Sequence, residues 1–424
     1  MPSSVISHKS AIAVFFLIFI VMNVLDLSAG IKNVNPVDGH QYRPILRTAR
    51  EGFFNFIGSN GNDEYSFNLN MKRGKLQRQF KASEPFLCDV NVGRRSQKVP
   101  DSVHKLLPGD IDIIGAFGDS LTAGNGAMAT NILQIMTENK GMSWSIGGQG
   151  TWRKFLTLPN ILKEYNPNIY GYSLADGLSY HKSSVFNVAE IGAMSRDIPY
   201  MAKVLVKRMK SDPKVDIKHH WKLITLLIGA NDFCSDMCYH DTPEVITKLH
   251  EKHLLAALRT IRDNLPRTIV NVVSAPDVTI LLKFTGKPME CVAVHYVECP
   301  CFFSSRFGKN RKRYVKIIKD WHAMERNVTD RDEFHNLADF TVNYNPFTSK
   351  LVFPLNEEGR TDFRYLSMDC FHLSQRGYAI ATNGYWNNMM EPYGNKSTTW
   401  SRKEFVDFKC PTKEMPYLRT KGNS

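Results

Sequence analysis

The chain has 424 residues, more than one small module needs at about 100 to 200 residues per domain, and enough to bury a sizeable core. Hydrophobic residues make up 43% of the chain, charged residues 22% and aromatic residues 11%, which excludes disordered, collagen-like and coiled-coil proteins. The 54 Lys and Arg residues outnumber the 41 Asp and Glu residues, so the formal net charge is +13 and an anionic partner or surface is expected.

Residues 1–29 have the order of a secretory signal peptide. His8 and Lys9 precede an apolar run from Ala11 to Met22, and small residues follow it. We therefore expect cleavage near the end of this segment and a secreted mature protein. An uncleaved anchor is the alternative, but the apolar run is shorter than the roughly 20 residues that a membrane-spanning helix needs. The polar C-terminus, Leu418–Ser424, does not have the pattern of a lipid-anchor tail.

In an exported protein, an even number of cysteines indicates disulfide bonds rather than metal ligands or redox thiols. Cys234 and Cys238 could close a small loop. The Cys-Pro-Cys step at 299–301 is expected to direct one or both sulfurs to more distant partners, of which Cys291 is the nearest candidate. The spacings do not match those of zinc sites, so no metal is expected. The full set, whose pairing the sequence leaves open, is Cys88, Cys234, Cys238, Cys291, Cys299, Cys301, Cys370 and Cys410.

Two glycosylation sequences and one basic run are expected at the surface of an exported chain. The tripeptides that begin at Asn327 and Asn395 match the acceptor sequence for N-glycosylation, although such tripeptides also arise by chance. The densest basic run, Lys309–Lys319, could contact an anionic membrane surface, be cleaved by a protease, or be a solvated helix entry. No nucleic-acid-binding module is present in the sequence, and export argues against such a partner.

From Asp110 onward, short apolar runs alternate with longer helical patterns, which is typical of an α/β domain. The runs are rich in Val, Ile, Leu, Phe and Thr, as expected of strands buried on both faces. They predict strands at Ile111–Phe117, Leu223–Ile228, Thr268–Ser274 and Phe340–Tyr344.

Three segments between and after these strands have helical periodicity. The pattern over 245–265 ends before Pro266, which cannot continue a helix, and similar patterns cover 314–326 and 378–390. No internal repeat is found, so one domain over 84–424 follows an N-terminal extension, residues 30–83, that shows no sustained period. The apolar face of the first helix is expected to contain Ile246, Leu249, His253, Leu254, Leu258 and Ile261.

Ser120 follows the first predicted strand directly, in the sequence Gly-Asp-Ser-Leu. In parallel sheets ligands bind at the carboxyl ends of the strands, and free backbone N–H groups at a helix start can stabilise an oxyanion. Ser120 is therefore a candidate nucleophile. The alternative is a helix N-cap, for which Ser is a favoured residue.

Two further segments could supply oxyanion donors. Asn231 follows the second predicted strand in Gly-Ala-Asn-Asp and offers a side-chain amide at the same end of the sheet. Gly192 lacks a side chain, so its backbone N–H could approach a substrate oxygen.

Asp369 and His372 form an Asp-x-x-His pair just before the helix expected to begin near Ser374. An Asp three positions before a His can accept a hydrogen bond from Nδ1 of the imidazole. Nε2 is then free to act as a general base. Ser120, Gly192, Asn231 and this pair, in this order, are hard to obtain by accident.

With these residues in this order, the sequence resembles the GDSL or SGNH hydrolases and, within them, the animal phospholipase B family. The segment 118–127, Gly-Asp-Ser-Leu-Thr-Ala-Gly-Asn-Gly-Ala, looks like the nucleophile block of that family, and the resemblance runs from about Glu84 to Ser424. The block at Gly192 departs from the family pattern, with Met194-Ser195 in place of an expected Arg-Ala. Further similar segments are 99–104, 143–148, 157–162, 226–232, 386–389, 391–392, 410–411 and 416–420.

The resemblance implies a three-layer, flavodoxin-like α/β fold with a mostly parallel sheet. It implies hydrolysis of fatty-acyl esters of phospholipids and lysophospholipids at a lipid interface, with Ser120 as nucleophile, His372 as base and Asp369 orienting it. The oxyanion would be held by the Ser120 N–H, the Gly192 N–H and the Asn231 amide. No cofactor is required, and the enzyme is expected to act as a free monomer. The alternatives are an esterase for retinyl, short-chain or other esters, and a non-catalytic, secreted lipid-surface-binding module.

Overall fold

The computed structural model describes residues 43–424. The expected signal peptide, residues 1–29, lies outside the described residues, as do residues 30–42 of the expected N-terminal extension. Within the described part of the chain, no helix is both long enough and apolar enough to cross a membrane.

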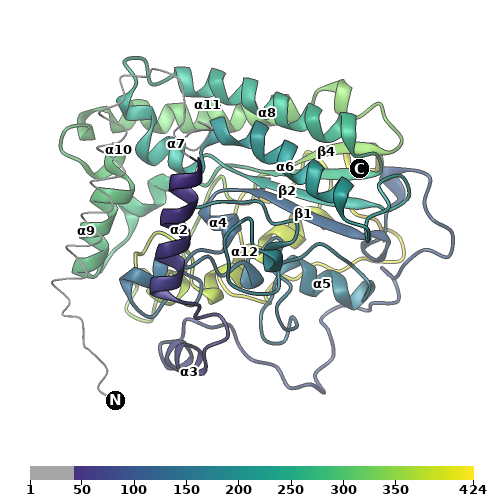
Figure 1. Ribbon diagram of the computed structural model, residues 1–424, viewed down its shortest axis with the longest axis horizontal. Coiled ribbons are helices and arrows are strands. Elements are labelled where there is room, and N and C mark those ends of the chain that lie inside the picture. Colours follow the sequence, from purple (N-terminus) through teal and green to yellow (C-terminus); the bar gives the residue numbers. More distant parts are fainter. Residues whose placement is uncertain (1–42) are drawn as a thin grey trace.

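A parallel sheet of four strands forms the centre of the fold (Figure 1). Every residue of these strands is buried, because helices cover both faces of the sheet. This burial accounts for the largely apolar runs in the sequence, and all four predicted strands are confirmed. In sheet order they are β1 (Ile113–Gly118), β2 (Lys222–Leu227), β3 (Thr268–Val273) and β4 (Phe340–Asn345).

A short stretch around Tyr170 pairs with the outer edge of β1. Ile113 and Tyr170 form an isolated parallel bridge, and Ala116 and Asn187 form another. If the stretch at Tyr170 is counted as a second strand in chain order, the sheet order becomes the 2-1-3-4-5 order of flavodoxin-like folds. The predicted α/β, flavodoxin-like class is therefore confirmed.

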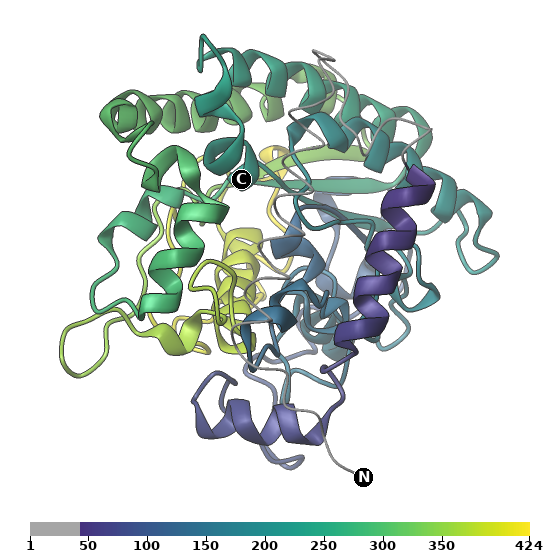
Figure 2. The same ribbon diagram turned by 60° about the vertical axis from the view of Figure 1, so that its left-hand side comes forward.

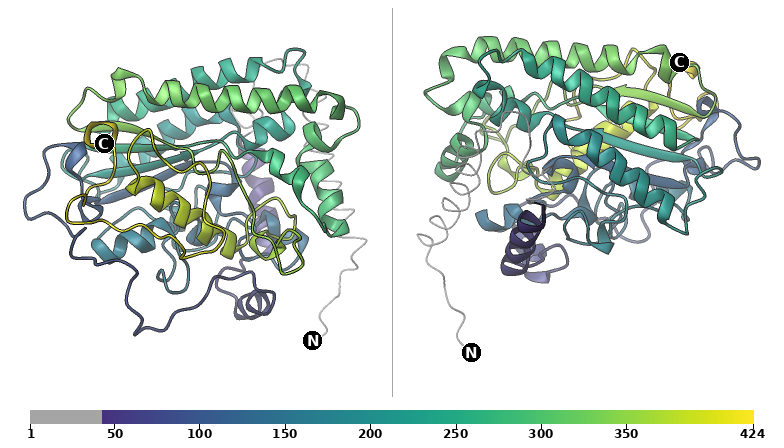
Figure 3. Two further views of the ribbon diagram at one scale, coloured as in Figure 1. Left: turned by 180° about the vertical axis from the view of Figure 1, so that it is seen from behind. Right: turned by 45° about the horizontal axis from the view of Figure 1, so that its top comes forward.

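Helices on the two faces of the sheet complete a three-layer arrangement (Figures 1 and 3). Phe117 and Leu226 pack into the core on one face, and Ile114 and Leu223 pack into the core on the other. The alternation follows from the pleat of the strands, in which successive side chains point to opposite faces. The first face is covered by α6 (Ile198–Ser211) and α8 (Val245–Asn264), and the second by α5 (Leu158–Tyr165) and α12 (Gln375–Met390).

The remaining helices flank these layers. The predicted helices over 314–326 and 378–390 are confirmed as α11 and α12, and each begins three residues earlier than predicted, at 311 and 375. Ser374 is the N-cap of α12, where its side chain accepts a hydrogen bond from the Gly377 N–H. The flanking helices are α2 (Arg43–Ile57), α3 (Glu64–Lys72), α4 (Ser120–Ala123), α7 (Ala230–Ser235), α9 (Met289–Glu298), α10 (Pro300–Phe303) and α11 (Arg311–Thr329).

The predicted helix over 245–265 is confirmed as α8, but its buried face is rotated from the predicted one. Leu249 is 39% exposed, whereas His250 is fully buried. The imidazole of His250 stacks on the Trp321 ring with 3.9 Å between centroids, so a polar residue occupies a core position through a ring contact.

The N-terminal extension contains two helices that the sequence pattern did not predict. α2 and α3 lie along the outside of the domain (Figure 2). The buried residues of α3 are Ser66 and Asn70, and Asn70 donates a hydrogen bond from Nδ2 to the Met128 carbonyl at 3.0 Å. Because polar side chains make this contact, the helix has no apolar stripe that periodicity could detect.

Four disulfides link the described residues, and their pairing corrects two expectations. Cys234 and Cys238 do not close a small loop with each other, and Cys291 does not pair with the Cys-Pro-Cys step. Cys234 lies on α7 and Cys238 four positions later, so both side chains face the segment 299–301. The expectation that this step bonds to distant cysteines is confirmed. The pairs are Cys88–Cys410, Cys234–Cys299, Cys238–Cys301 and Cys291–Cys370.

Candidate active site

Ser120 is the first residue of α4 and lies directly beyond the carboxyl end of β1. Gly118 closes the strand with a φ of +149°, and a Cβ atom there would lie 2.1 Å from the Leu227 carbonyl oxygen of β2. Asp119, not Ser120, is the N-cap of α4, because its side chain accepts a hydrogen bond from the Leu121 N–H. The N-cap interpretation of Ser120 is therefore wrong, and its hydroxyl is available for another contact.

The Ser120 hydroxyl contacts His372, which in turn contacts Asp369. Nε2 of His372 lies 2.8 Å from Oγ of Ser120, and Nδ1 lies 2.5 Å from Oδ2 of Asp369. All three residues are buried, with exposed fractions of 4%, 5% and 0% for Ser120, His372 and Asp369. When Nδ1–H donates to the carboxylate, Nε2 carries the lone pair that can accept the hydroxyl proton.

The loop that carries Asp369 and His372 holds the carboxylate in a fixed orientation. Oδ1 of Asp369 accepts hydrogen bonds from the N–H groups of Phe371 and His372, both at 3.0 Å. Burial alone would raise the pKa of Asp369, but the imidazole of His372 and these hydrogen bonds outweigh burial and lower the pKa below its usual value. Cys370, which follows Asp369 in this loop, adopts a left-handed φ of +55°.

Asn231 and Gly192 lie at the same end of the sheet as Ser120. Asn231 is the second residue of α7, which follows β2, and its Nδ2 donates to the Ala193 carbonyl at 2.9 Å. The loop before Gly192 lies on the end of β1, because the Glu190 N–H donates to the Gly118 carbonyl at 3.1 Å. Within the described residues, both candidate donor segments therefore lie at the carboxyl end of β1, next to Ser120.

Asp232 joins α7 to residues 187–195, which we call the Gly192 loop. The sequence did not predict this contact. Its carboxyl oxygens lie 3.2 and 3.0 Å from the Ser195 N–H. Burial and the neighbouring Asp236 raise the pKa of Asp232 to about 8, so the carboxyl is largely protonated at neutral pH. The only signal in the sequence was its place directly after Asn231.

Ser195 also contacts a histidine, with Oγ 2.5 Å from Nδ1 of His250. Asp232 contacts the backbone N–H of Ser195, and burial lowers the pKa of His250 well below its usual value, which keeps the imidazole neutral. This second serine–histidine contact is buried between α8 and the Gly192 loop. The contact between Ser195 and His250 therefore holds the Gly192 loop against α8.

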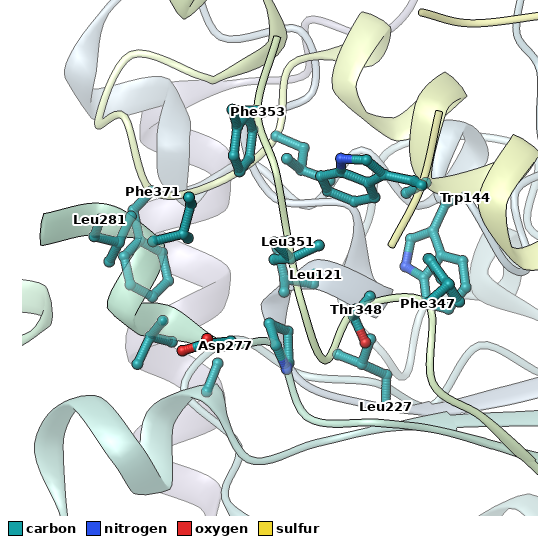
Figure 4. A pocket seen from close by; sticks show the side chains of 17 residues that line it. Leu121, Trp144, Leu227, Asp277, Leu281, Phe347, Thr348, Leu351, Phe353 and Phe371 are labelled. Carbon is teal, nitrogen blue, oxygen red and sulfur yellow. The ribbon is translucent and has the colours of Figure 1, made fainter. Parts of the chain in front are cut away.

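Residues next to Ser120 and His372 in the chain line an apolar pocket (Figure 4). Leu121 is the residue after Ser120, and Phe371 and Leu373 are the two chain neighbours of His372. Leu227 and Ala230 bring the end of β2 and the start of α7 to the same wall. The rest of the lining is Trp144, Pro276, Asp277, Val278, Ile280, Leu281, Phe347, Thr348, Leu351, Phe353, Ala381 and Trp400.

A model of the GDSL-like lipase/acylhydrolase family matches residues 114–384, a range that contains Ser120, the Gly192 loop, Asn231, Asp369 and His372. The chain belongs to this family. Its confirmed α/β architecture is that of the SGNH hydrolases, which the resemblance to this family implied.

Known proteins similar to the chain include "Phospholipase B1, membrane-associated" from Homo sapiens, 38% identical over 347 residues, which covers 80% of this chain and 23% of that protein. The protein of the same name from Rattus norvegicus is 38% identical over 344 residues, with 80% and 23% covered. The chain thus spans about a quarter of the length of these relatives. Among solved structures, phospholipase A1 from Streptomyces albidoflavus is 16% identical, with 63% of this chain and 95% of that chain covered and a TM-score of 0.30.

Proposed function

We propose that the protein is a serine ester hydrolase that releases fatty acids from phospholipids and lysophospholipids. The observation that carries the proposal is the continuous contact from Ser120 through His372 to Asp369 beside an apolar pocket. Membership of the GDSL-like lipase/acylhydrolase family and the names of the similar phospholipases support the choice of substrate.

In the first half of the reaction, Ser120 Oγ attacks the ester carbonyl carbon while Nε2 of His372 takes the hydroxyl proton. Asp369 stabilises the imidazolium that forms. His372 then gives the proton to the leaving alcohol oxygen, the carbon–oxygen bond of the ester breaks, and the acyl group remains on Ser120. In the second half, a water molecule attacks this acyl-enzyme, His372 takes the water proton, and Ser120 regains a proton as the fatty acid leaves.

Three donors would stabilise the oxyanion that forms in each half. Among the described residues, no acceptor partners the N–H groups of Ser120 and Gly192. Nδ2 of Asn231 carries two hydrogens, and the bond to the Ala193 carbonyl uses one of them. The second hydrogen would be free for the substrate oxygen, in a site where each such donor contributes about 3 kcal/mol to transition-state stabilisation.

The apolar pocket would hold the acyl chain. Leu121 and Phe371, which line the pocket (Figure 4), are the chain neighbours of Ser120 and His372, so an acyl chain in the pocket would leave its ester carbonyl near Ser120. Each methylene group that leaves water contributes about 0.8 kcal/mol to binding, which favours long chains over acetyl groups. This preference distinguishes a lipid substrate from a short-chain ester.

The substrate would be reached at a lipid surface. Met289 and Tyr296 on α9 and Leu355 are 80%, 53% and 61% exposed, and Leu355 follows closely after Phe353, which lines the pocket. Exposed apolar side chains of this kind fit contact with aggregated lipid. Secretion and glycosylation belong to the same proposal, and the exposure of Asn327 and Asn395 supports glycosylation.

The test is fatty-acid release from a diacyl phospholipid in mixed micelles, followed together with the lysophospholipid intermediate. We expect release by the wild-type protein and at least a 1,000-fold loss in Ser120→Ala, because the acyl-enzyme cannot form without the hydroxyl. Cleavage of retinyl or short-chain esters without phospholipid hydrolysis would replace the proposed substrate. Inertness toward all esters, with retained binding to lipid vesicles, would favour a non-catalytic module.

A further inference from the structure

The last residue of α9, Glu298, carries a carboxyl group that lies beside Asp369 and His372. One side-chain oxygen or nitrogen from each of the three residues lies within 4.8 Å of the others. Although part of the residue is exposed, Oε2 of Glu298 is buried and has no hydrogen-bond partner among the described residues. The reaction proposed above assigns no task to this group.

Two carboxyl groups this close in a buried site cannot both be ionised, because each charge raises the free energy of the other. Asp369 is committed to the ionised form by two backbone N–H groups and the imidazole of His372. The proton of the pair therefore belongs on Glu298, in agreement with burial and the Asp369 charge, which raise the pKa of Glu298 well above its usual value. A protonated carboxyl is a hydrogen-bond donor.

The same face of α9 is fixed to the loop of Asp369 and His372 at two other points. Cys291 forms a disulfide with Cys370, and Nε2 of His295 lies 3.0 Å from the Cys370 carbonyl oxygen. Positions 291, 295 and 298 are separated by four and three residues, so they share one face of the helix. α9 is thus aligned against the loop along its length, and Glu298 contacts it at Asp369.

We propose that Glu298 is a positioning residue for acyl transfer, and that its protonated carboxyl donates a hydrogen bond to Asp369. This inference rests on the proposed function. The donated bond satisfies a buried carboxylate without adding a charge, so Asp369 stays ionised and aimed at Nδ1 of His372. An apolar side chain at 298 leaves that carboxylate less stabilised, and the imidazole loses part of its orientation.

The test compares Glu298→Gln, which keeps the shape and an N–H donor, with Glu298→Met, which keeps much of the length and removes the donor. We expect kcat for phospholipid hydrolysis to fall about tenfold or more in the Met variant, with KM within about twofold, since a hydrogen bond to a charged group is lost. The Gln variant should stay within about threefold of wild type. Glu290→Ala, on the exposed side of the same helix, is the matched control and should change neither constant.

Proton NMR supplies a readout that helix packing alone would not move. The low-field signal of the His372 Nδ1–H should persist in Glu298→Gln and shift in Glu298→Met. Equal kcat in wild type and the Met variant, or an equal fall in both variants, would overturn the donor role. If the Met variant does not fold, Glu298→Asp, which withdraws the donor by one methylene, replaces it with the same expected loss. Absence of hydrolysis by the wild-type protein would instead refute the proposed function, so the two failures are distinguishable.

Discussion

Ser120 meets His372 because the two residues before it set the backbone at the end of β1. Gly118 passes the Leu227 carbonyl at a distance that leaves no room for a Cβ atom, and Asp119 caps the short helix that Ser120 begins. The serine side chain is thereby released from capping and faces the imidazole. Residues 118–120 and the neighbouring strand β2 therefore determine the position of the candidate nucleophile.

Substitution of Gly118 by Ala should disturb both the fold and the reaction. The new Cβ atom would lie 2.1 Å from the Leu227 carbonyl oxygen, and the φ of +149° is strained for any side chain. We expect the free energy of unfolding to fall by about 3 kcal/mol or more, with loss of ester hydrolysis. Gly359→Ala is the matched control, because its φ is +72° but nothing lies within 4 Å of the added Cβ, so only about 1 to 2 kcal/mol should be lost. Equal losses in the two variants, measured by urea unfolding, would refute the role of the close contact.

The sequence predicted the candidate site residues that belong to short contiguous motifs. Ser120, Asn231 and the Asp369–His372 pair follow strands or precede a helix at spacings that chemistry requires, and the structure places them at one end of the sheet. Glu298 could not be found in this way. Its contact with Asp369 depends on how α9 packs against a distant loop, and no local spacing encodes that packing.

The secondary-structure elements were predictable where burial is apolar and local. The four strands and α8, α11 and α12 were predicted because their buried faces contain regular apolar residues. α3 was missed because it buries polar residues, and the face of α8 was misjudged because His250 packs as a ring on Trp321. The disulfide pairing depended on α7 facing the segment 299–301, which is a tertiary contact.

The contact between α8 and α11 contains a buried acid, Glu325, whose protonation should tune stability. Oε1 accepts from Nε1 of Trp321 at 2.9 Å and lies 3.4 Å from Nε2 of His250. Burial raises the pKa of Glu325 from 4.5 to about 8, so the folded protein keeps a proton that the unfolded chain releases above pH 4.5. The stabilising contribution is present below pH 4.5 and is lost as pH rises toward 8.

Replacement of Glu325 by Gln should therefore remove a pH dependence of folding. The free energy of unfolding of the wild type, relative to the Gln variant, should fall from pH 4.5 to pH 8, by up to about 1.4 kcal/mol per pH unit. Urea unfolding of both proteins at pH 4.5, 6 and 8 measures this difference. A difference that is constant across this range would show that Glu325 is not held protonated.

At the scale of the whole molecule, contacts from outside the predicted domain reach the candidate site. Arg50 of α2 donates to the Glu190 carboxylate at 2.6 Å, beside the Gly192 loop. Lys75 donates from Nζ to the Leu366 carbonyl at 2.5 Å, in the segment that leads to Asp369. The N-terminal extension from residue 43 onward therefore braces both segments that the proposed reaction uses.

Acidic side chains pair with part of the basic run, Lys309–Lys319, in this chain of net charge +13. Arg313 pairs with Glu244 through two hydrogen bonds of 2.7 Å, and Lys316 pairs with Asp320 at 2.6 Å. These exposed pairs leave less free charge for an anionic membrane than the sequence alone suggested. Attraction of this run to a membrane stays a prediction.

The most direct test of the account is to identify the residue that reacts with a fluorophosphonate, which traps an activated serine. The wild-type protein should be labelled at Ser120, as peptide mapping by mass spectrometry would show, because its hydroxyl contacts the imidazole of His372 and its chain neighbour Leu121 lines the apolar pocket. Labelling should vanish in Ser120→Ala and persist at Ser120 in Ser195→Ala, which removes the other serine–histidine contact. Labelling at Ser195, or no labelling of a protein that hydrolyses phospholipid, would contradict the account.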